Sequence, residues 1–438
     1  MSTRDDNDRV RDGETLDASE GELVTVNAPA IEHARQVLER VVGEALAAAT
    51  FDHGADFRPG VALEELVKRA PERMRDAGLV EQASALPPTF GEITGAALSR
   101  LERRANGGEK AIPLPWPTLA EHLGGGLWPG MHVLVSGTGA GKTQFALQLA
   151  LHAAEHGTPV AYVGLELDAL QVFTRLVALR STRLKWSELY RGEAGEGAIV
   201  QAAELANAIA TLPLHVEEAP PGAYPASRLE SLARALREKY PEATPGARPM
   251  LIVLDFLQLV GAEAANARAD LRERIGSAAY IARGVASRMN AAVLLVSSTA
   301  RANYGATTGN GTGDGKPGYE LVSDGTVRGA DALVGLGKES GEIEYAADSV
   351  SVAIRRAEVT RSDGASGVAF ITAKLRAGVP RWVPLAFNGT RLDEWTGGFT
   401  PMATKSTPAT STPKSTTAKH TAKHTKSTPE SDEEGGEW

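Results

Sequence analysis

HVLVSGTGAGKT, residues 132–143, is the most informative segment of this sequence. It opens as an apolar run, passes through three closely spaced glycines and leads into a helical pattern of apolar residues that begins at Phe145. A strand, a glycine-rich turn and a helix in this order form a loop whose backbone N–H groups surround a phosphate. The segment therefore predicts a phosphate-binding loop at the end of a buried strand.

Each position of this loop has an expected role toward a nucleotide. Lys142 would reach the β- and γ-phosphates, and the hydroxyl of Thr143 would bind Mg²⁺. Ser136 stands where glycine is usual, but this residue ends the strand and has no need to approach phosphate. We expect ATP and Mg²⁺ as the ligands. The expected nucleotide-binding residues are Gly137, Thr138, Gly139, Ala140, Gly141, Lys142, Thr143 and Gln144.

Short apolar runs alternate with helical patterns between about residues 109 and 397. This alternation predicts an α/β fold, with a mainly parallel sheet covered by helices on both faces and with last strands that are free to run antiparallel. The glycine- and threonine-rich run between Arg301 and Arg328 predicts a long mobile loop. The expected strands are Met131–Ser136, Pro159–Leu165, Leu212–Glu217, Leu251–Asp255, Ala291–Ser297, Val350–Arg355, Val368–Lys374 and Val383–Phe387.

Two acidic residues end other predicted strands. Asp255 follows four apolar residues in LIVLDFLQL, where a carboxylate either holds magnesium or merely caps a turn. Glu166, in VAYVGLELD, ends the strand that follows the loop's helix. A carboxylate there either polarises an attacking water or is simply solvated. The spacing alone leaves both pairs of alternatives open.

The rest of the chain predicts a small helical region and two disordered ends. Residues 1–25 are charged and poor in apolar residues, and residues 398–438 are rich in Lys, Thr, Ser and Pro before an acidic tip. Residues 26–108 carry helical patterns and end in a linker helix at about 89–105, which a capping box of Thr89 and Glu92 begins. The apolar stripe of this helix would pack on its own domain or on a neighbouring subunit.

Bulk composition narrows the classes of function. The chain has 438 residues, of which 42% are hydrophobic, and this suffices for a sizeable core. It has no cysteine, which excludes disulfides, thiol nucleophiles and Cys-based zinc sites. The sequence has neither a long apolar run nor a secretory signal pattern, so we expect a cytoplasmic protein without a membrane partner. The formal charge of −9 restricts contact with nucleic acid to local basic patches.

Five motifs in one order resemble the motor domain of DnaB-type replicative helicases. They are GGLWPGMHVLVSGTGAGKT, GLELD, LIVLDFLQL, KESGEIEYAAD and AKLRAG, and they cover about Leu114 to Trp395. The resemblance implies a RecA-like P-loop NTPase core at residues 109–397, assembled as a homo-hexameric ring. It implies an ATP hydrolase that moves along single-stranded DNA from 5′ to 3′ and separates the duplex.

The resemblance does not extend to the first hundred residues, which are unlike the helical collar of that family. A primase or a loader as partner is compatible with the resemblance, but no contact residues for either can be carried over. A shortened, divergent N-terminal region fits a helicase of a plasmid, a phage or another mobile element.

The resemblance also implies roles for residues outside the loop. The catalytic base of the family falls on Glu166, the magnesium-holding aspartate on Asp255, and a glutamine that links phosphate state to DNA contact on Gln258. Lys374 and Arg376 alternate in AKLRAG, so a regular strand would point both side chains to the same face. In the family this pair reaches the nucleotide of the next subunit; without a neighbour it would be a solvated basic edge.

One segment of the family lines the central channel of the ring and grips the DNA backbone. A few basic residues repeated around a ring would suffice to track phosphates, whereas outside a ring they would be ordinary surface charges. Lys316 adds positive charge nearby. The expected DNA-binding residues are Lys338, Glu339, Gly341, Arg301 and Arg328.

Ser298, in SSTAR, departs from the family, which usually has a glutamine there that senses the γ-phosphate. A serine side chain is shorter, so the coupling of hydrolysis to movement is in doubt. The main alternative to a helicase is therefore a non-translocating RecA-like ATPase that acts as a switch or scaffold. A strand-exchange filament is a third hypothesis, less favoured because KESGEIEYAAD and AKLRAG resemble helicase elements.

Overall fold

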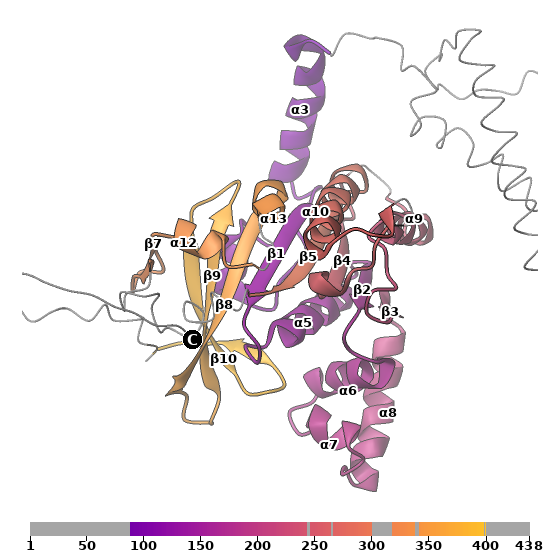
Figure 1. The fold of residues 1–438 in the computed structure, drawn as a ribbon, viewed down its shortest axis with the longest axis vertical. Coiled ribbons are helices and arrows are strands. Elements are labelled where there is room, and N and C mark those ends of the chain that lie inside the picture. Colours follow the sequence, from indigo (N-terminus) through magenta and orange to yellow (C-terminus); the bar gives the residue numbers. More distant parts are fainter. Residues whose placement is uncertain are drawn as a thin grey trace, which may run out of the picture. The chain divides into compact units, whose positions relative to one another are not determined.

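The computed structural model describes residues 88–242, 246–263, 266–299, 318–337, 341–397 and 399 (Figure 1). The disorder predicted at 1–25 and in the C-terminal tail, the helical patterns at 26–87 and the loop at 301–317 lie outside the described residues. The chain divides into two compact units, residues 1–101 and 102–438, and each is described by itself.

A nine-stranded sheet forms the centre of the second unit, in the order β11-β10-β9-β8-β1-β5-β4-β2-β3. The strands from β8 to β3 in this order are parallel, whereas β8–β9, β9–β10 and β10–β11 pair antiparallel. The predicted α/β class and the antiparallel last strands are therefore confirmed. The strands are β1 (Gly130–Ser136), β2 (Val160–Gly164), β3 (Leu214–Glu218), β4 (Met250–Asp255), β5 (Ala291–Ser298), β8 (Ser349–Thr360), β9 (Ser366–Leu375), β10 (Arg381–Phe387) and β11 (Leu392–Glu394).

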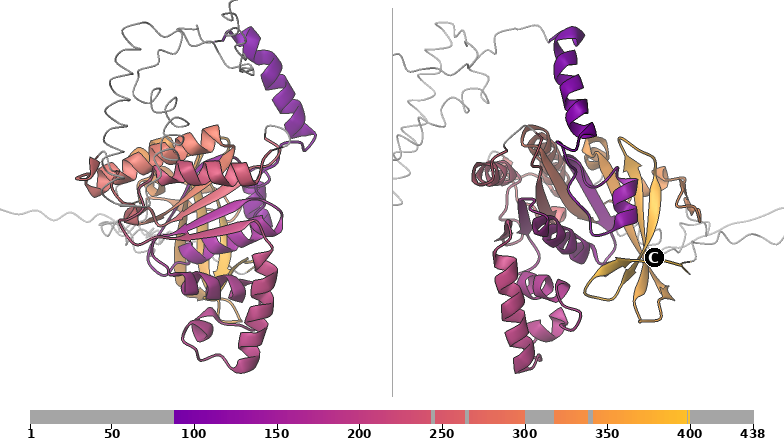
Figure 2. Two further views of the ribbon diagram at one scale, coloured as in Figure 1. Left: turned by 90° about the vertical axis from the view of Figure 1, so that its right-hand side faces the viewer. Right: turned by 180° about the vertical axis from the view of Figure 1, so that it is seen from behind.

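Helices cover both faces of the sheet (Figure 2). Alternate residues of β1 serve the two cores, because successive side chains of a strand point to opposite faces. Val133 belongs to the core with Leu229 of α9 and Ile275 of α10, and Leu134 to the core with Phe145 of α5. The helices of the sheet region are α4 (Pro117–His122), α5 (Lys142–Glu155), α6 (Ala169–Leu179), α9 (Arg228–Lys239), α10 (Leu271–Arg288), the 3₁₀ helix η2 (Leu257–Leu259), α12 (Asp331–Val334) and α13 (Gly341–Ala346).

Two more helices, α7 (Trp186–Tyr190) and α8 (Glu196–Ala210), pack with α6 into a helical group beside the sheet (Figure 1). A small apolar cluster of Val177, Leu184 and Ala202 holds this group together. The sequence between β2 and β3 thus forms an extension of the sheet domain.

The described part of the first unit is the start of helix α3 (Phe90–Ala105), which continues into the second unit. Thr89 and Glu92 form the predicted capping box: the Glu92 N–H donates to Thr89 Oγ1 at 3.3 Å, and the Thr89 N–H donates to Glu92 Oε2 at 2.6 Å. The apolar stripe of α3 has no buried residue.

Two parts of the fold differ from the sequence prediction. Residues 318–328, expected to belong to a mobile loop, include a hairpin of β6 (Glu320–Leu321) and β7 (Val327–Arg328). Trp382 of β10 holds it, because its indole N–H donates to the Val322 carbonyl at 2.7 Å and its backbone N–H donates to Gly325 at 2.9 Å. Strand β11 was not predicted, since three residues carry too short a pattern. Within the described residues, no helix has both the length and the apolar character that crossing a bilayer requires.

Candidate nucleotide-binding site

The glycine-rich loop between β1 and α5 has the backbone of an anion site. Gly139 and Gly141 adopt φ values of 77° and 89°, in the left-handed region that favours glycine. Gly141 is the N-cap of α5, and no side chain caps the helix there. The N–H groups of the first turn are therefore available to an anion, which the helix dipole would also attract.

Three strands, β1, β4 and β2, end at one edge of the sheet and bring Thr143, Asp255 and Glu166, respectively, to it. We call this edge the carboxyl edge. Strand β5 lies between β1 and β4, and β2 pairs with β4 so that Gly164 lies opposite Asp255. Glu166 follows β2 by two residues and is exposed. In parallel sheets, ligands bind outside this edge.

Asp255 is the buried acid of the site, with only 2% of its surface exposed. The hydroxyl of Tyr162 donates to its Oδ2 at 2.7 Å, whereas Oδ1 has no hydrogen-bond partner among the described residues. Burial raises the pKa of Asp255, and the hydroxyls of Tyr162 and Thr143 and the charge of Lys142 offset only part of this effect. A buried carboxylate oxygen beside a threonine hydroxyl and a phosphate loop fits Mg²⁺, which prefers oxygen ligands.

Arg175 of α6 is a site residue that the sequence did not reveal. Its guanidinium lies 3.7 Å from the centre of the Trp186 ring, and its Nη1 is 3.4 Å from Oε1 of Gln144, the residue after the loop. The charges of Asp255 and Glu166 act on Arg175, although burial lowers its pKa. A single arginine inside a helical pattern has no local signal, so only the fold places this cation beside two carboxylates.

The opposite flank of the loop is formed by Arg355 and Phe387. Arg355 donates to the Gly139 carbonyl at 3.2 Å and to Ser366 Oγ at 3.0 Å. A Cβ at Gly141 would lie 3.4 Å from the Phe387 ring, so the ring packs directly against the loop. Phe387 was predicted only as a strand residue, and Arg355 was not singled out.

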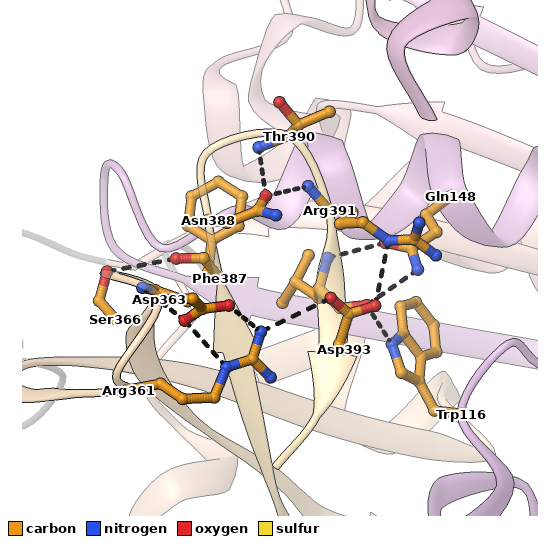
Figure 3. Close-up of polar contacts among 12 residues, drawn as sticks. Trp116, Gln148, Arg361, Asp363, Ser366, Phe387, Asn388, Thr390, Arg391 and Asp393 are labelled. Atoms are coloured by element: carbon orange, nitrogen blue, oxygen red, sulfur yellow. Dashed lines mark hydrogen bonds and ion pairs between the residues drawn. The ribbon is translucent and has the colours of Figure 1, made fainter. Parts of the chain in front are cut away.

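Figure 3 shows how the turn between β10 and β11 is fixed beside α5. Gln148 of α5 donates to the Leu392 carbonyl and accepts from the Leu392 N–H, both at 2.9 Å. Asn388 Oδ1 accepts from the backbone N–H groups of Thr390 and Arg391 at 3.0 and 2.9 Å. The loop helix and the turn that carries Phe387 are therefore held together.

Gln258 spans from η2 to the end of β5. Its Nε2 donates to Ser297 Oγ at 2.8 Å, and its Oε1 accepts from the Ser298 N–H at 3.1 Å. Ser298 thus meets Gln258 through its backbone. The side chain of Gln258 links the strand ends of β4 and β5 at the carboxyl edge.

Lys374 and Arg376 lie at the opposite edge of the sheet. Strand β9 ends at Leu375, and a register shift next to Val350 leaves Ala373 without a partner residue just before Lys374. The bulge precedes Lys374, and the strand ends one residue before Arg376, so the shared face of the two basic side chains stays a prediction. Arg376 forms an ion pair with Asp348 at 3.1 Å.

The predicted DNA-binding residues are only partly described. Arg301, Lys316, Lys338 and Glu339 lie outside the described residues. Gly341 begins α13, and Arg328 of β7 pairs with Glu320 across the hairpin at 3.1 Å. The role of these residues stays a prediction.

Known proteins are similar to this chain in sequence and in fold. A family model described as the DnaB-like helicase C terminal domain matches residues 116–310. The replicative DNA helicase DnaB of Rhodothermus marinus is 24% identical over 299 residues, which make up 66% of this chain and 30% of that protein. The resemblance to DnaB-type helicases is thus confirmed, and the family match covers the first three of the five motifs.

Two solved structures are similar in fold. One is an isolated ATPase domain, which superposes with a TM-score of 0.56 at 19% identity, covering 70% of this chain and all of that one. A DnaB-like replicative helicase, studied with its interactions with primase, superposes with a TM-score of 0.54 at 17% identity, covering 83% of this chain and 77% of that one. Both likenesses confirm the RecA-like fold.

Proposed function

We propose that this chain, whose residues 116–310 match the DnaB-like helicase C terminal domain, hydrolyses ATP with Mg²⁺ to move along single-stranded DNA and separate the duplex. The observation that carries the proposal is the buried, unpartnered Oδ1 of Asp255 beside the glycine-rich loop. A structural carboxylate would satisfy both oxygens within the protein, since a buried polar atom without a partner costs about 1–3 kcal/mol. A cation site accounts for the oxygen left over.

The residues of the carboxyl edge divide the work of hydrolysis. Lys142 and the N–H groups of the loop hold the β- and γ-phosphates, and Glu166 accepts a proton from the attacking water. As the water oxygen bonds to the γ-phosphorus, the bond from this phosphorus to the bridging oxygen breaks, and ADP and inorganic phosphate form. Mg²⁺ held by Asp255 and Thr143 would supply positive charge at the phosphate oxygens.

The position of the basic pair supports the proposal of a ring of copies. Lys374 and Arg376 lie at the end of the sheet where β1 begins, whereas the glycine-rich loop lies where β1 ends. Five residue steps of strand separate these edges by about 17 Å. At this distance the pair does not reach the loop of its own chain, so we assign it to the site of a neighbour. A six-membered ring repeats this contact at every seam.

The same proposal assigns the remaining segments. Residues 109–397 are the motor domain, and residues 26–108 are a helical region that ends in the linker helix. The segment at Lys338, Glu339 and Gly341, with Arg301 and Arg328, lines the channel for single-stranded DNA. A primase or a loader is a candidate partner of the helical region, and a mobile genetic element is a candidate source.

Three measurements on the purified full chain test this proposal: ATP hydrolysis with and without single-stranded DNA, displacement of a labelled strand, and the mass of the nucleotide-bound particle. We expect DNA-stimulated hydrolysis, strand displacement and a particle mass that corresponds to six copies. Lys142→Ala should abolish hydrolysis and strand displacement but leave assembly intact. Hydrolysis that ignores DNA, without strand displacement, would instead support the non-translocating switch that Ser298 suggests.

A further inference from the structure

The edge of the sheet where β1 and β8 begin carries a cluster of one acid and two arginines, which we call the amino edge: Asp348, Arg283 and Arg376. Asp348 immediately precedes β8, and only 22% of its side chain is exposed. Its Oδ2 accepts from the Met131 N–H at 2.9 Å and pairs with Arg283 of α10. Its Oδ1 pairs with Nε of Arg376 at 3.1 Å.

The surroundings fix the carboxylate in place. Arg283 also donates to the Ala346 carbonyl at 3.2 Å, so its guanidinium bridges the turn before β8. A Cβ at Gly130 would lie 2.7 Å from Oδ2 of Asp348, which only a glycine avoids. The Arg376 N–H donates to the Asp348 carbonyl at 2.8 Å, so backbone and side chain of the same residue hold Arg376. Asp348 therefore acts as a rigid anchor.

The Arg376 guanidinium meets Asp348 through the nitrogen nearest the chain, and its terminal amino groups lie beyond this contact. The ion pair joins Nε of Arg376 to Oδ1 of Asp348 at 3.1 Å. The side chain is 53% exposed. A guanidinium held by Nε keeps a planar pair of donors for a phosphate oxygen.

Charge favours the same arrangement. Burial opposes ionisation of Asp348, but the hydrogen bonds from Arg283 and Met131 and the charges of both arginines outweigh it, so the pKa of Asp348 is lowered. One ionised carboxylate facing two guanidinium groups leaves the amino edge with a net positive charge. The cluster therefore presents a cation to an anion outside this chain.

We propose that Asp348 is a positioning residue for catalysis in the neighbouring subunit: it holds Arg376 by Nε so that the terminal amino groups meet the γ-phosphate bound by the next copy. The inference rests on the proposed function, because it requires that Arg376 act across a seam between copies. It adds a residue that touches no nucleotide and is separated from the site of its own chain by the length of β1.

A mixing experiment separates this role from a purely structural one. Lys142→Ala protomers cannot hydrolyse ATP but carry an intact Asp348 and Arg376. Asp348→Asn protomers have an intact loop but an unanchored Arg376, and we expect their kcat to fall roughly a hundredfold, as for a misplaced catalytic group, with KM for ATP unchanged. When the two variants assemble together, the Asp348→Asn loop meets an intact Arg376 at the mixed seams. ATP hydrolysis should then rise well above the sum of the separate activities.

Parallel mixtures make the outcomes distinguishable. If Arg376→Ala is not rescued by Lys142→Ala, action across the seam fails, and the proposed ring mechanism fails with it. If Arg376→Ala is rescued and Asp348→Asn is not, only the positioning role of Asp348 is overturned. In the Arg376→Ala background, Asp348→Asn should lower kcat no further; an additional loss would also contradict the inference.

Two further variants control for folding. Glu242→Gln breaks the Arg237–Glu242 ion pair of 2.7 Å, which is buried at least as deeply and does not involve Arg376. It should lower thermal stability and leave kcat unchanged. Asp348→Glu keeps the charge but displaces it by one methylene. This variant tests the proposal if Asp348→Asn does not assemble. A folded Asp348→Glu protein with wild-type kcat would overturn the proposal.

Discussion

Each of the two edges of the sheet carries an aspartate, buried at the carboxyl edge and partly exposed at the amino edge, and the two aspartates have opposite surroundings. Asp255, at the carboxyl edge, has an unused oxygen and a pKa raised by burial. Asp348, at the amino edge, faces two arginines, and its pKa is lowered. The first carboxylate has an oxygen without a partner among the described residues, and the second pairs with two arginines. The difference supports our proposal that one edge binds a magnesium nucleotide and the other serves the nucleotide of another copy.

The largest effect should come from removing the base at the carboxyl edge. Glu166→Gln should lower kcat for ATP on the order of a thousandfold, because the amide cannot accept the proton of the attacking water. Nucleotide affinity should be retained, as measured by fluorescent ATP binding. The matched control is Glu217→Gln on neighbouring β3, which pairs with Arg228 and should keep wild-type kcat. Equal losses in both variants would mean that Glu166 has no special role.

Asp255 should lower the free energy of unfolding of the nucleotide-free protein. Because burial raises its pKa above that of the unfolded chain, the ionised form destabilises the nucleotide-free fold at neutral pH. Asp255→Asn should therefore raise the melting temperature without nucleotide, while abolishing hydrolysis and the stabilisation that Mg²⁺ and ATP give the wild type. A lower melting temperature in Asp255→Asn would show that the carboxylate is structural.

A smaller effect is expected on the flank of the loop. Trp186 stacks on Arg175, and its indole N–H donates to the Gly389 carbonyl at 3.0 Å, next to the turn that carries Phe387. Trp186→Ala removes a cation–π contact and a hydrogen bond, together about 1–2 kcal/mol. KM for ATP should rise several-fold with little change in kcat.

Trp128→Ala is the matched control for this variant. The Trp128 ring also packs against an arginine, because the Arg104 guanidinium lies 4.6 Å from the ring centre. The indole N–H of Trp128 donates to the Gly124 carbonyl at 3.0 Å. It should lose similar stability and keep KM. If both variants raise KM alike, the Trp186 effect is general destabilisation.

The smallest expected effect is a difference between Asp348 and Asp255 in how each makes the free energy of unfolding depend on pH. Asp348 has a lowered pKa, so its contribution to stability is complete above the ordinary carboxyl value of roughly 4 and is lost as pH falls through the folded-state value. Asp255 has the opposite sign, because stability falls as pH rises through the window above that value. The free energy of unfolding, measured with denaturant between about pH 3 and pH 7, reports both effects. Asp348→Asn and Asp255→Asn should each flatten its own part of the plot of this free energy against pH.

The carboxyl edge was largely predictable from sequence, and the amino edge was not. The loop, Asp255 and Glu166 each follow an apolar run that specifies a strand, so local pattern places them at one edge. Eight strands were predicted for the same reason. Their roles remain predictions, since position alone does not test chemistry.

The contacts missed from sequence join distant residues. Met131 and Asp348 are 217 residues apart, Gly139 and Arg355 are 216 apart, and Gln148 and Leu392 are 244 apart. No local pattern encodes such pairs. The bulge before Lys374 was missed because one extra residue leaves the apolar pattern of β9 intact.

The central claim is that one copy's Arg376 completes the site of the next, so hydrolysis belongs to the assembly. The most direct test is the rate of ATP hydrolysis per chain, measured across a dilution series with particle mass recorded in the same samples. We predict that the rate per chain falls in step with the loss of assembled copies. A monomer that hydrolyses ATP at the full rate would contradict the claim.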